Sequence, residues 1–317
     1  PTLPPPVRRV QGIESLREIV TGGGLDHVQL EPGAMGGELG VVDLGGVLLG
    51  YGAVDRAMRS RGEYNPVGYN VGVLLDCPDK GCRIWGAPGS RGTVVVGPPK
   101  AEADTVTPGQ FTFGYLIVPP DVWESVVDDL APARTAALVR EKSVINPDAA
   151  AAARVAGRFQ EAVAELIRRP GLTAAPGAAA GLREDLLAAV VRAAAADDTP
   201  PPTGQFVRHR RVVARAEEFV AGRGPAAVSV RELCRACDVS ERTLHYAFKD
   251  VLGLNPVQYL IRRRLSAVRY ELSAGGPVPG AVARAAGKWG FWHLGHFAAA
   301  YRKLFGESPS ATARLRG

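Results

Sequence analysis

The chain has 317 residues, of which 46% are hydrophobic and 22% are charged, a composition typical of globular domains rather than of disordered or collagen-like chains. No apolar run approaches the roughly 18 residues that a membrane span needs, and four cysteines are too few for a disulfide scaffold in a chain of this size. The first residues carry neither the basic nor the apolar segment of a secretion signal. We therefore expect a cytoplasmic protein that does not enter a membrane.

The net charge of +6 is distributed unevenly along the chain. Residues 205–317 hold 19 Lys and Arg against 8 Asp and Glu, whereas residues 1–204 hold 19 against 24. A basic C-terminal third beside a mildly acidic remainder indicates a polyanionic partner for that third. The alternative is a solvated basic face without a partner.

A composition break divides the chain in two. Residues 193–204 have no periodic apolar pattern and include three consecutive prolines, which favours a stiff, extended linker. We predict a first domain over residues 1–196, a linker over 197–204 and a second domain over 205–317. The length is sufficient for each domain to bury a core of its own.

Residues 25–120 are predicted to be rich in β-strands, because runs of Val, Leu and aromatic residues are punctuated by Gly and Pro. Many short strands indicate a barrel or a sandwich. The runs that we expect to form strands are residues 27–30, 39–54, 69–75, 83–85, 93–96 and 111–118. Phe111, Phe113, Tyr115 and Ile117 alternate in the last run, so one face of that strand can point inward.

Residues 121–196 are predicted to be helical. Asp121 is a candidate N-cap for a helix over residues 122–130, and Pro147 precedes an Ala-rich helical stretch that extends to Arg169. Apolar side chains recur every three or four residues in that stretch and in the next helix, which contains Leu182 and Leu186. Such stripes either pack onto the sheet of the same domain or form a dimer interface.

Everything after the linker has a helical pattern, and it contains an internal repeat. Seven positions recur with an offset of 53 residues, and both copies end in a hydrophobe-Gly-x-x-Pro sequence, at Gly253 and Pro256 and again at Gly306 and Pro309. The glycine is typical of a helix C-cap, and the proline is typical of the first residue of the next helix. We therefore predict an α+β chain whose second domain is all-α, with a long helix over about residues 256–273 between the two copies.

Each copy has the pattern of a helix-turn-helix unit. In the first, over about residues 229–250, Ser229 and Glu232 form a capping box before one short helix, and Ser240 caps a second helix. The outer side of that second helix carries basic and aromatic residues, which suit the DNA major groove. The second copy spans about residues 282–304. A helical hairpin with a solvated polar face is the alternative for one copy, and two copies in a basic domain favour DNA.

The C-terminal third resembles the DNA-binding domain of the AraC/XylS family of bacterial transcription regulators. The motifs that carry the resemblance are VSERTLHYAFK at residues 239–249, GLNP at 253–256, GFWHLGHF at 290–297 and YRKLFGESP at 301–309. The resemblance implies two helix-turn-helix units that enter successive segments of the major groove. It also implies that residues 1–196 bind a small organic effector and support dimerisation, although there it is based on domain order and composition rather than on a motif.

The resemblance also implies which residues contact DNA. In the first unit, Arg242, His245 and Tyr246 would face the bases, with Lys249 beside them. The second unit has Leu294, Gly295 and Ala299 where polar or basic groups are common in the family. Its candidate contacts are Trp292, His293 and His296, with Arg302 and Lys303 at phosphates. The run Arg262-Arg263-Arg264 is a further candidate for phosphate contact, or for ion pairs within the protein.

Three other signals are weaker. Cys234 and Cys237 are predicted to pack in the helical core, and Cys77 and Cys82 to be two thiols in a turn, with a local disulfide or a thiol sensor as alternatives. Residues 1–196 hold one histidine, His27, so we predict no metal and no cofactor. No triad, nucleophile elbow or phosphate-binding loop is evident, and we predict no enzymatic activity.

The alternating aromatic residues suggest where an effector would bind. Phe111, Phe113 and Tyr115, together with Trp85, are predicted to line a largely apolar pocket, and the alternative is that they only fill a core.

The predicted function is that of an effector-responsive activator of transcription that binds promoter DNA mainly through the first helix-turn-helix unit. It would act as a homodimer, with RNA polymerase as a possible partner. The alternatives are a regulator that responds to thiol oxidation or to no ligand, and an enzyme tethered to DNA.

Overall fold

The computed structural model describes residues 7–19, 24–64, 67–78, 82–169, 171–196, 204–225 and 227–314. Most of the expected linker, residues 197–203, lies outside the described residues. Within the described ranges, every helix is too short or too polar to cross a membrane.

Seven strands form the larger of two antiparallel sheets, in the order β1-β3-β4-β11-β6-β9-β12. They are β1 (Val7–Val10), β3 (Gly37–Asp43), β4 (Leu48–Val54), β6 (Tyr69–Asp76), β9 (Val94–Gly97), β11 (Phe111–Val118) and β12 (Ser143–Ile145). The aromatic run over residues 111–118 is central in this sheet, between β4 and β6. Both of its edges are hydrogen-bonded, so its side chains occupy fixed positions on the two faces.

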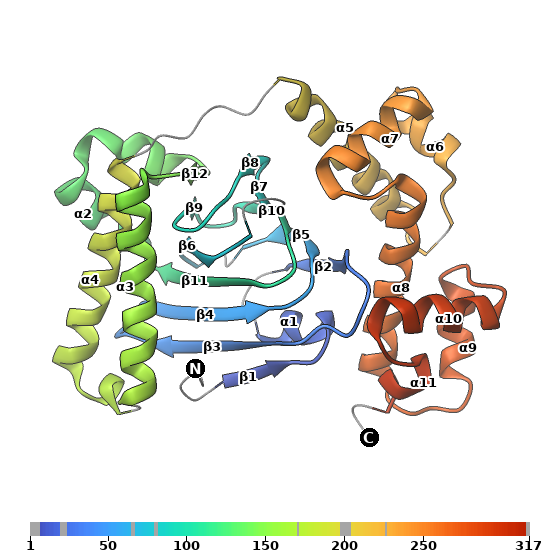
Figure 1. Ribbon diagram of the computed structural model, residues 1–317, viewed down its shortest axis with the longest axis horizontal. Helices are drawn as coiled ribbons and strands as arrows, with labels where there is room; N and C mark the ends of the chain where they lie inside the picture. The colour runs from blue at the N-terminus through green and yellow to red at the C-terminus, as the bar shows by residue number, and fades with distance from the viewer. Residues whose placement is uncertain are drawn as a thin grey trace.

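The second sheet has the order β2-β5-β10-β7-β8. Its strands are β2 (Asp26–Gln29), β5 (Met58–Glu63), β7 (Arg83–Ile84), β8 (Ala87–Pro88) and β10 (Glu102–Thr107). A short helix, α1 (Ile13–Ile19), lies beside β1 and β2 (Figure 1). Two separate antiparallel sheets confirm the predicted β-rich first domain, in a sandwich-like arrangement.

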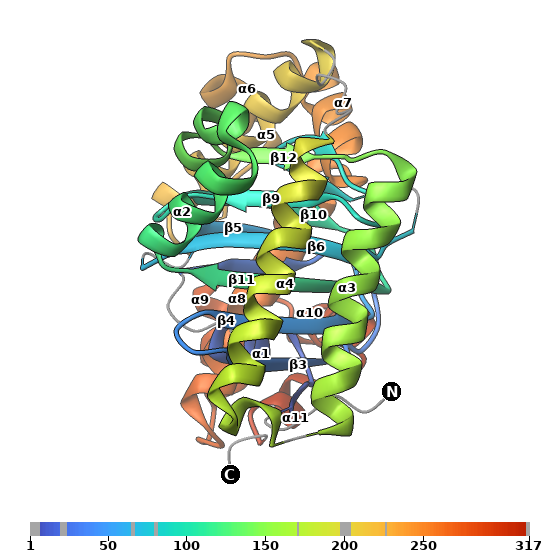
Figure 2. The same ribbon diagram turned by 90° about the vertical axis from the view of Figure 1, so that its left-hand side faces the viewer.

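Three helices cover the outer face of the larger sheet (Figures 1 and 2). They are α2 (Pro120–Leu130), α3 (Ala149–Arg168) and α4 (Pro176–Ala195). Val155, Phe159 and Leu186 of the apolar stripes are buried in one cluster with the sheet, so these stripes pack onto their own domain, the first of the two alternatives. The predicted N-cap Asp121 is wrong. Pro119 occupies that position, and Asp121 lies in the first turn, where its charge favours the positive end of the helix dipole.

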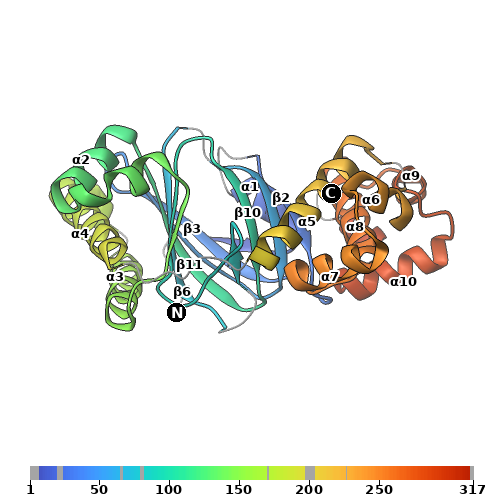
Figure 3. The same ribbon diagram turned by 90° about the horizontal axis from the view of Figure 1, so that it is seen from above.

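The remaining helices lie on the far side of the smaller sheet (Figures 1 and 3). They are α5 (Gly204–Gly222), α6 (Val230–Cys237), α7 (Glu241–Leu252), α8 (Pro256–Gly275), α9 (Ala281–Lys288), α10 (Leu294–Phe305) and α11 (Pro309–Thr312). The predicted repeat is confirmed at its ends, since Gly253 and Gly306 are both left-handed C-caps, with φ of 68° and 74°. Asn255 and Ser308 then cap the following helices.

Some strands differ from the prediction. The run over residues 39–54 divides into β3 and β4, which are joined by a turn at Gly45 and Gly46 with positive φ. Strand β5 was not predicted, because its sequence, MRSRGE, is polar and the usual signal for a strand is an apolar alternation. Arg59 and Ser60 are nevertheless buried there. A polar strand of this kind is buried only when another part of the chain supplies its partners.

That partner is the helical half of the chain. The Arg59 guanidinium on β5 pairs with the Glu217 carboxylate on α5, at 2.9 Å from Nη2 to Oε2, and with Asp104 on β10 at 2.5 Å. Tyr259 on α8 donates to Glu217 Oε1 at 2.5 Å. Burial alone would lower the pKa of Arg59, but the charges of Glu217 and Asp104 outweigh it and raise that pKa above its ordinary value. The Arg59 guanidinium therefore stays charged.

A second set of contacts joins the two halves near the chain start. Arg269 on α8 is buried and pairs with Glu14 on α1, with 2.5 Å from Nε to Oε2, and with Glu307 at 2.8 Å. The Gln29 amide on β2 donates to the Leu304 carbonyl of α10 at 2.8 Å. Apolar side chains of the first half also share one cluster with α8, α9 and α10, among them Leu39 and Phe111. The helical half is thus docked on the smaller sheet through buried polar and apolar contacts.

We expect Glu217→Ala to destabilise the chain by about 3–5 kcal/mol, because it leaves the buried Arg59 charge without its main partner. Asp185→Ala is the matched control. It removes an ion pair of similar length with Arg158, but both side chains are about half exposed, so the loss should stay below about 1 kcal/mol. Urea unfolding followed by circular dichroism measures both, and equal losses in the two variants would contradict the prediction.

Candidate functional site

The first helix-turn-helix unit is built from α6 and α7, and local capping sets its geometry. Ser229 and Glu232 form the predicted capping box at the start of α6. Asp238 then adopts a left-handed conformation, with φ of 54°, which makes the turn, and the Ser240 hydroxyl accepts from the Thr243 amide at 3.2 Å. Leu244 and Phe248 are buried on the inner side of α7. The opposite side of α7 is therefore fixed toward solvent.

That outer side carries the predicted DNA contacts. Arg242 is exposed, and the side chain of Tyr246 is 55% exposed. The Arg242 guanidinium donates to the Tyr246 hydroxyl at 3.3 Å and lies 5.4 Å from the centre of its ring. His245 is partly exposed beside Glu241, and the Lys249 ammonium donates to the Gly253 carbonyl at 3.1 Å. Arg242, His245 and Tyr246 thus project from the first two turns of α7, and Lys249 follows one turn later.

The second unit, α9 and α10, has a different outer surface. Trp292 is 80% exposed and Leu294 is 48% exposed at the start of α10. His293 is the N-cap residue but makes no side-chain cap, and its ring lies 5.9 Å from that of His296. The exposed surface at the beginning of α10 is therefore mainly aromatic and apolar.

Basic residues follow at the end of α10, where Arg302 and Lys303 are both exposed. The three arginines of the run at residues 262–264 are all partly buried. Arg264 is partly buried, with its guanidinium 4.8 Å from the centre of the Phe291 ring, and burial lowers the pKa of both Arg262 and Arg264. Arg302 and Lys303 are thus the better placed candidates for phosphate contact.

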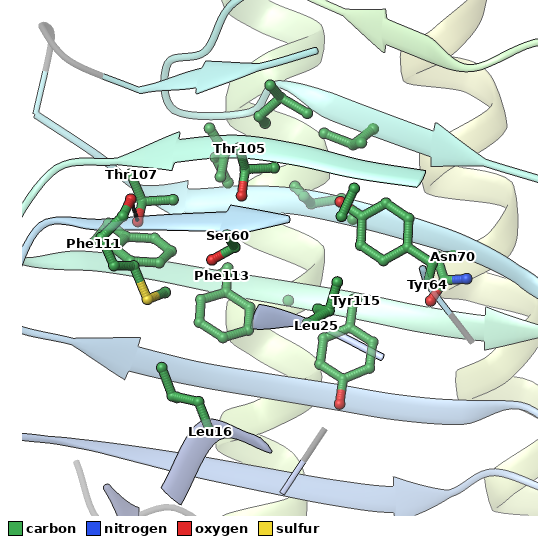
Figure 4. A pocket seen from close by; sticks show the side chains of 18 of the residues that line it. Leu16, Leu25, Ser60, Tyr64, Asn70, Thr105, Thr107, Phe111, Phe113 and Tyr115 are labelled. Atoms are coloured by element: carbon green, nitrogen blue, oxygen red, sulfur yellow. Dashed lines mark hydrogen bonds between the residues drawn. The ribbon is translucent and has the colours of Figure 1, made fainter. Parts of the chain in front are cut away.

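A cavity of about 190 Å³ lies between the two sheets, and Figure 4 shows its lining. Phe111, Phe113 and Tyr115 all line it, as their alternation on β11 predicted. Gly50, opposite Tyr115 on β4, leaves room for that ring, since a Cβ there would overlap it. Residues that the sequence did not indicate also line the cavity: Leu16, Leu25, His27, Met58, Ser60, Tyr64, Asn70, Thr105 and Thr107.

Trp85 is placed elsewhere, which corrects the prediction for this residue. Its backbone has φ of 47°, its indole Nε1 donates to the Glu102 carbonyl at 2.7 Å, and its ring contacts Tyr64 edge to face. Its own carbonyl accepts from Arg210 on α5. Trp85 therefore lies behind the cavity lining, at the contact with the helical half.

Strand β5 connects the cavity with that contact. Met58 and Ser60 line the cavity, whereas Arg59 and Arg61 pair with Glu217 on α5. The alternation follows from the strand period of two. His27, on the neighbouring strand β2, also lines the cavity, and its ring Nδ1 is hydrogen-bonded to the Ser60 hydroxyl. The His27 backbone carbonyl accepts from the Tyr270 hydroxyl of α8 at 3.0 Å. One layer of backbone therefore separates the cavity from the helical half.

The cysteines are thiols in the structure. Cys237 is buried in the helical core and Cys234 is partly exposed beside it. Cys77 and Cys82 are buried next to Leu74, Ile84 and Val95, which also line the cavity. Within the described residues, His, Cys, Asp and Glu side chains form no group of three that could hold a metal.

Comparisons with known proteins find similar regulators for part of the chain. A family described as a helix-turn-helix domain matches residues 233–315. The chain is 33% identical over 110 residues to the XylDLEGF operon transcriptional activator 2 of Pseudomonas putida, covering 35% of this chain and 70% of that protein. It is 32% identical over 103 residues to the probable thc operon regulatory protein of Rhodococcus erythropolis, covering 32% of this chain and 31% of that protein.

A solved structure from Rhodopseudomonas palustris, described as a probable AraC family transcriptional regulator, is 35% identical. The match covers 32% of this chain and 97% of the solved chain, with a TM-score of 0.30. Tandem helix-turn-helix units with exposed basic and aromatic residues are the architecture of DNA-binding transcription regulators. The chain belongs to the AraC/XylS family of transcriptional regulators. The match spans about a third of the length of the R. erythropolis relative.

We expect Cys82 to react slowly with a thiol reagent in the folded chain. A hydrogen bond with Cys77, together with burial, raises the pKa of Cys82, and a higher pKa leaves less of the reactive thiolate at any given pH. At pH 8, labelling by DTNB, resolved by mass spectrometry, should be at least about tenfold slower at Cys82 than at Cys234. In guanidinium chloride the two should react alike, and fast labelling of Cys82 in the folded chain would contradict the prediction.

Proposed function

We propose that this chain is an effector-responsive activator of transcription that reads DNA sequence mainly through α7. The observation that carries the proposal is the exposed pair Arg242 and Tyr246 on a helix whose start is fixed by the Ser240 cap. The N-terminal part of a recognition helix approaches the base edges. An Arg there can bind the O6 and N7 atoms of guanine with two hydrogen bonds.

The two units are proposed to contribute differently. The start of α10 offers Trp292 and Leu294, and apolar groups of this kind distinguish bases mainly through the thymine methyl. His293 and His296 add polar groups, and Arg302 and Lys303 add positive charge that suits phosphates. The second unit would therefore supply affinity and orientation, while the first supplies most of the sequence discrimination.

The response to an effector is supported by the position of the cavity. Met58 and Ser60 line it from the strand that also carries Arg59. A molecule that displaces this strand by a fraction of an ångström changes the geometry of a buried ion pair, and close-packed contacts transmit such shifts. The proposed consequence is a change in how the helical half is docked and in how its two units meet DNA.

Activation is proposed because the P. putida relative carries the name of a transcriptional activator. Promoter DNA, a small organic effector and RNA polymerase are the proposed partners, in the cytoplasm and without enzymatic activity. Homodimerisation stays a prediction, and through α3 and α4 it would use their outward sides, since the apolar stripes are buried.

The test of base reading is Arg242→Ala. A cognate duplex is first selected from a random library with the purified full chain, and affinities are then measured on it and on a scrambled duplex at several salt concentrations. Arg242→Ala should weaken cognate binding by about 1–3 kcal/mol and relax discrimination at one base position. Equal weakening on both duplexes would show that α7 does not read the bases.

Two exposed residues of α10 are the matched controls. Lys303→Ala should weaken both duplexes alike and lower the slope of log affinity against log salt by about one, as expected for a lost phosphate contact. Leu294→Ala should leave the sequence preference almost unchanged. If Leu294→Ala abolishes sequence specificity instead, the second helix-turn-helix unit is the one that recognises the bases.

A further inference from the structure

The cavity between the sheets has a flat aromatic wall. Phe111, Phe113 and Tyr115 follow one another on the same face of β11. The centres of adjacent rings are 5.4 and 6.3 Å apart, and their planes are inclined by only 24° and 19°. Figure 4 shows Phe113 and Tyr115 side by side on this wall. Offset stacking favours a flat ring against such a surface.

The size of the cavity limits what can enter it. Its volume of about 190 Å³ is slightly larger than that of an engineered apolar cavity of about 150 Å³ that binds benzene. One six-membered ring with a small substituent fits this space, and a two-ring molecule would require the sheets to move apart.

The lining also favours an uncharged molecule. It consists mainly of aliphatic and aromatic side chains, with neutral polar groups such as Ser60, Thr105 and Thr107, and none of its described members is Asp, Glu, Lys or Arg. Burial raises the pKa of Tyr115 to about 12, so its hydroxyl is neutral at pH 7. An ion in such a lining would lose its hydration without a carboxylate, an ammonium or a guanidinium of the described lining beside it.

Hydroxyl groups offer specificity at the edges of this space. The Ser60 hydroxyl lies 2.8 Å from His27 Nδ1, and both side chains line the cavity. The tyrosine hydroxyls of Tyr64 and Tyr115 are in the lining as well. A hydroxyl on the ligand can therefore donate to or accept from neighbouring polar groups.

We infer that the cavity binds an uncharged molecule with a single aromatic ring and one small polar substituent, of the phenol class. This inference rests on the proposed effector response, since it names the chemical class of that effector.

The test compares two probes that differ in charge. At pH 7.5, 4-methylphenol is neutral, whereas 4-methylbenzoate has the same ring and methyl group but carries a carboxylate. Isothermal titration on the full chain should show 4-methylphenol binding at least about tenfold more tightly than 4-methylbenzoate, because the described lining offers the carboxylate no ammonium or guanidinium group. Thermal shift gives a second measurement, since a bound ligand stabilises the folded state.

A variant that fills the cavity locates the site. Gly72 on β6 is paired with Tyr115 on β11 and with Val95 on β9, and both partners line the cavity. Directly opposite residues point to the same face, so a side chain at Gly72 enters the cavity. Its Cβ would lie 3.6 Å from the Val95 Cβ, an ordinary contact. Gly72→Leu should abolish binding of 4-methylphenol, whereas Gly72→Ala should retain most of it.

Phe113→Leu is a second variant, for the case in which Gly72→Leu does not fold. It removes one ring from the wall and should weaken binding of 4-methylphenol several-fold. Binding of 4-methylbenzoate with equal or higher affinity would overturn the inference about charge. Absence of 4-methylphenol binding, or unchanged binding in folded Gly72→Leu, would overturn the site.

Affinity for the selected duplex, measured with and without 4-methylphenol, separates this inference from the proposed function. If the probe binds but leaves DNA affinity unchanged, the ligand class stands and the effector response fails. If the probe does not bind while Arg242→Ala still relaxes base discrimination, the inference fails and the DNA reading stands.

Discussion

Arg59 and Glu217 form an ion pair that is almost completely removed from water, although 158 positions separate them in the chain. Each charge would be costly to bury alone. Together with Asp104 and the Tyr259 hydroxyl they satisfy one another, and so they fix where α5 and α8 lie on the smaller sheet. The position of both helix-turn-helix units depends on this contact, because α8 links them and packs against the same surface.

The same strand explains how a molecule in the first half could affect DNA binding by the second. β5 presents Met58 and Ser60 to the cavity and Arg59 to α5 because neighbouring residues of a strand point to opposite faces. No separate transmitting element is required when a single strand forms both the wall of a cavity and the docking surface. A second contact, from Tyr270 to the backbone of β2, ties α8 to the neighbouring strand.

The two helix-turn-helix units share a scaffold but present different chemistry. Their C-caps at Gly253 and Gly306 and the following N-caps at Asn255 and Ser308 are equivalent. The exposed residues differ, since α7 presents Arg242 and Tyr246, whereas the start of α10 presents Leu294 and, just before the helix, Trp292. Such a division suits a protein in which one unit discriminates bases and the other grips the duplex.

The sequence by itself determined the helical half almost completely, because its signals are local. Each capping signal, at Ser229, Ser240 and the glycine C-caps, acts through a hydrogen bond to a residue at most four positions away. The repeat makes the glycine C-cap recognisable twice. The sequence also indicated the alternating face of β11 that lines the cavity. Only the tertiary structure decided the position of Trp85 outside that lining, the burial of polar β5, and the pairing of Arg59 with Glu217. These depend on which distant segment supplies a charge, a hydroxyl or an apolar surface, and local patterns carry no information about such partners.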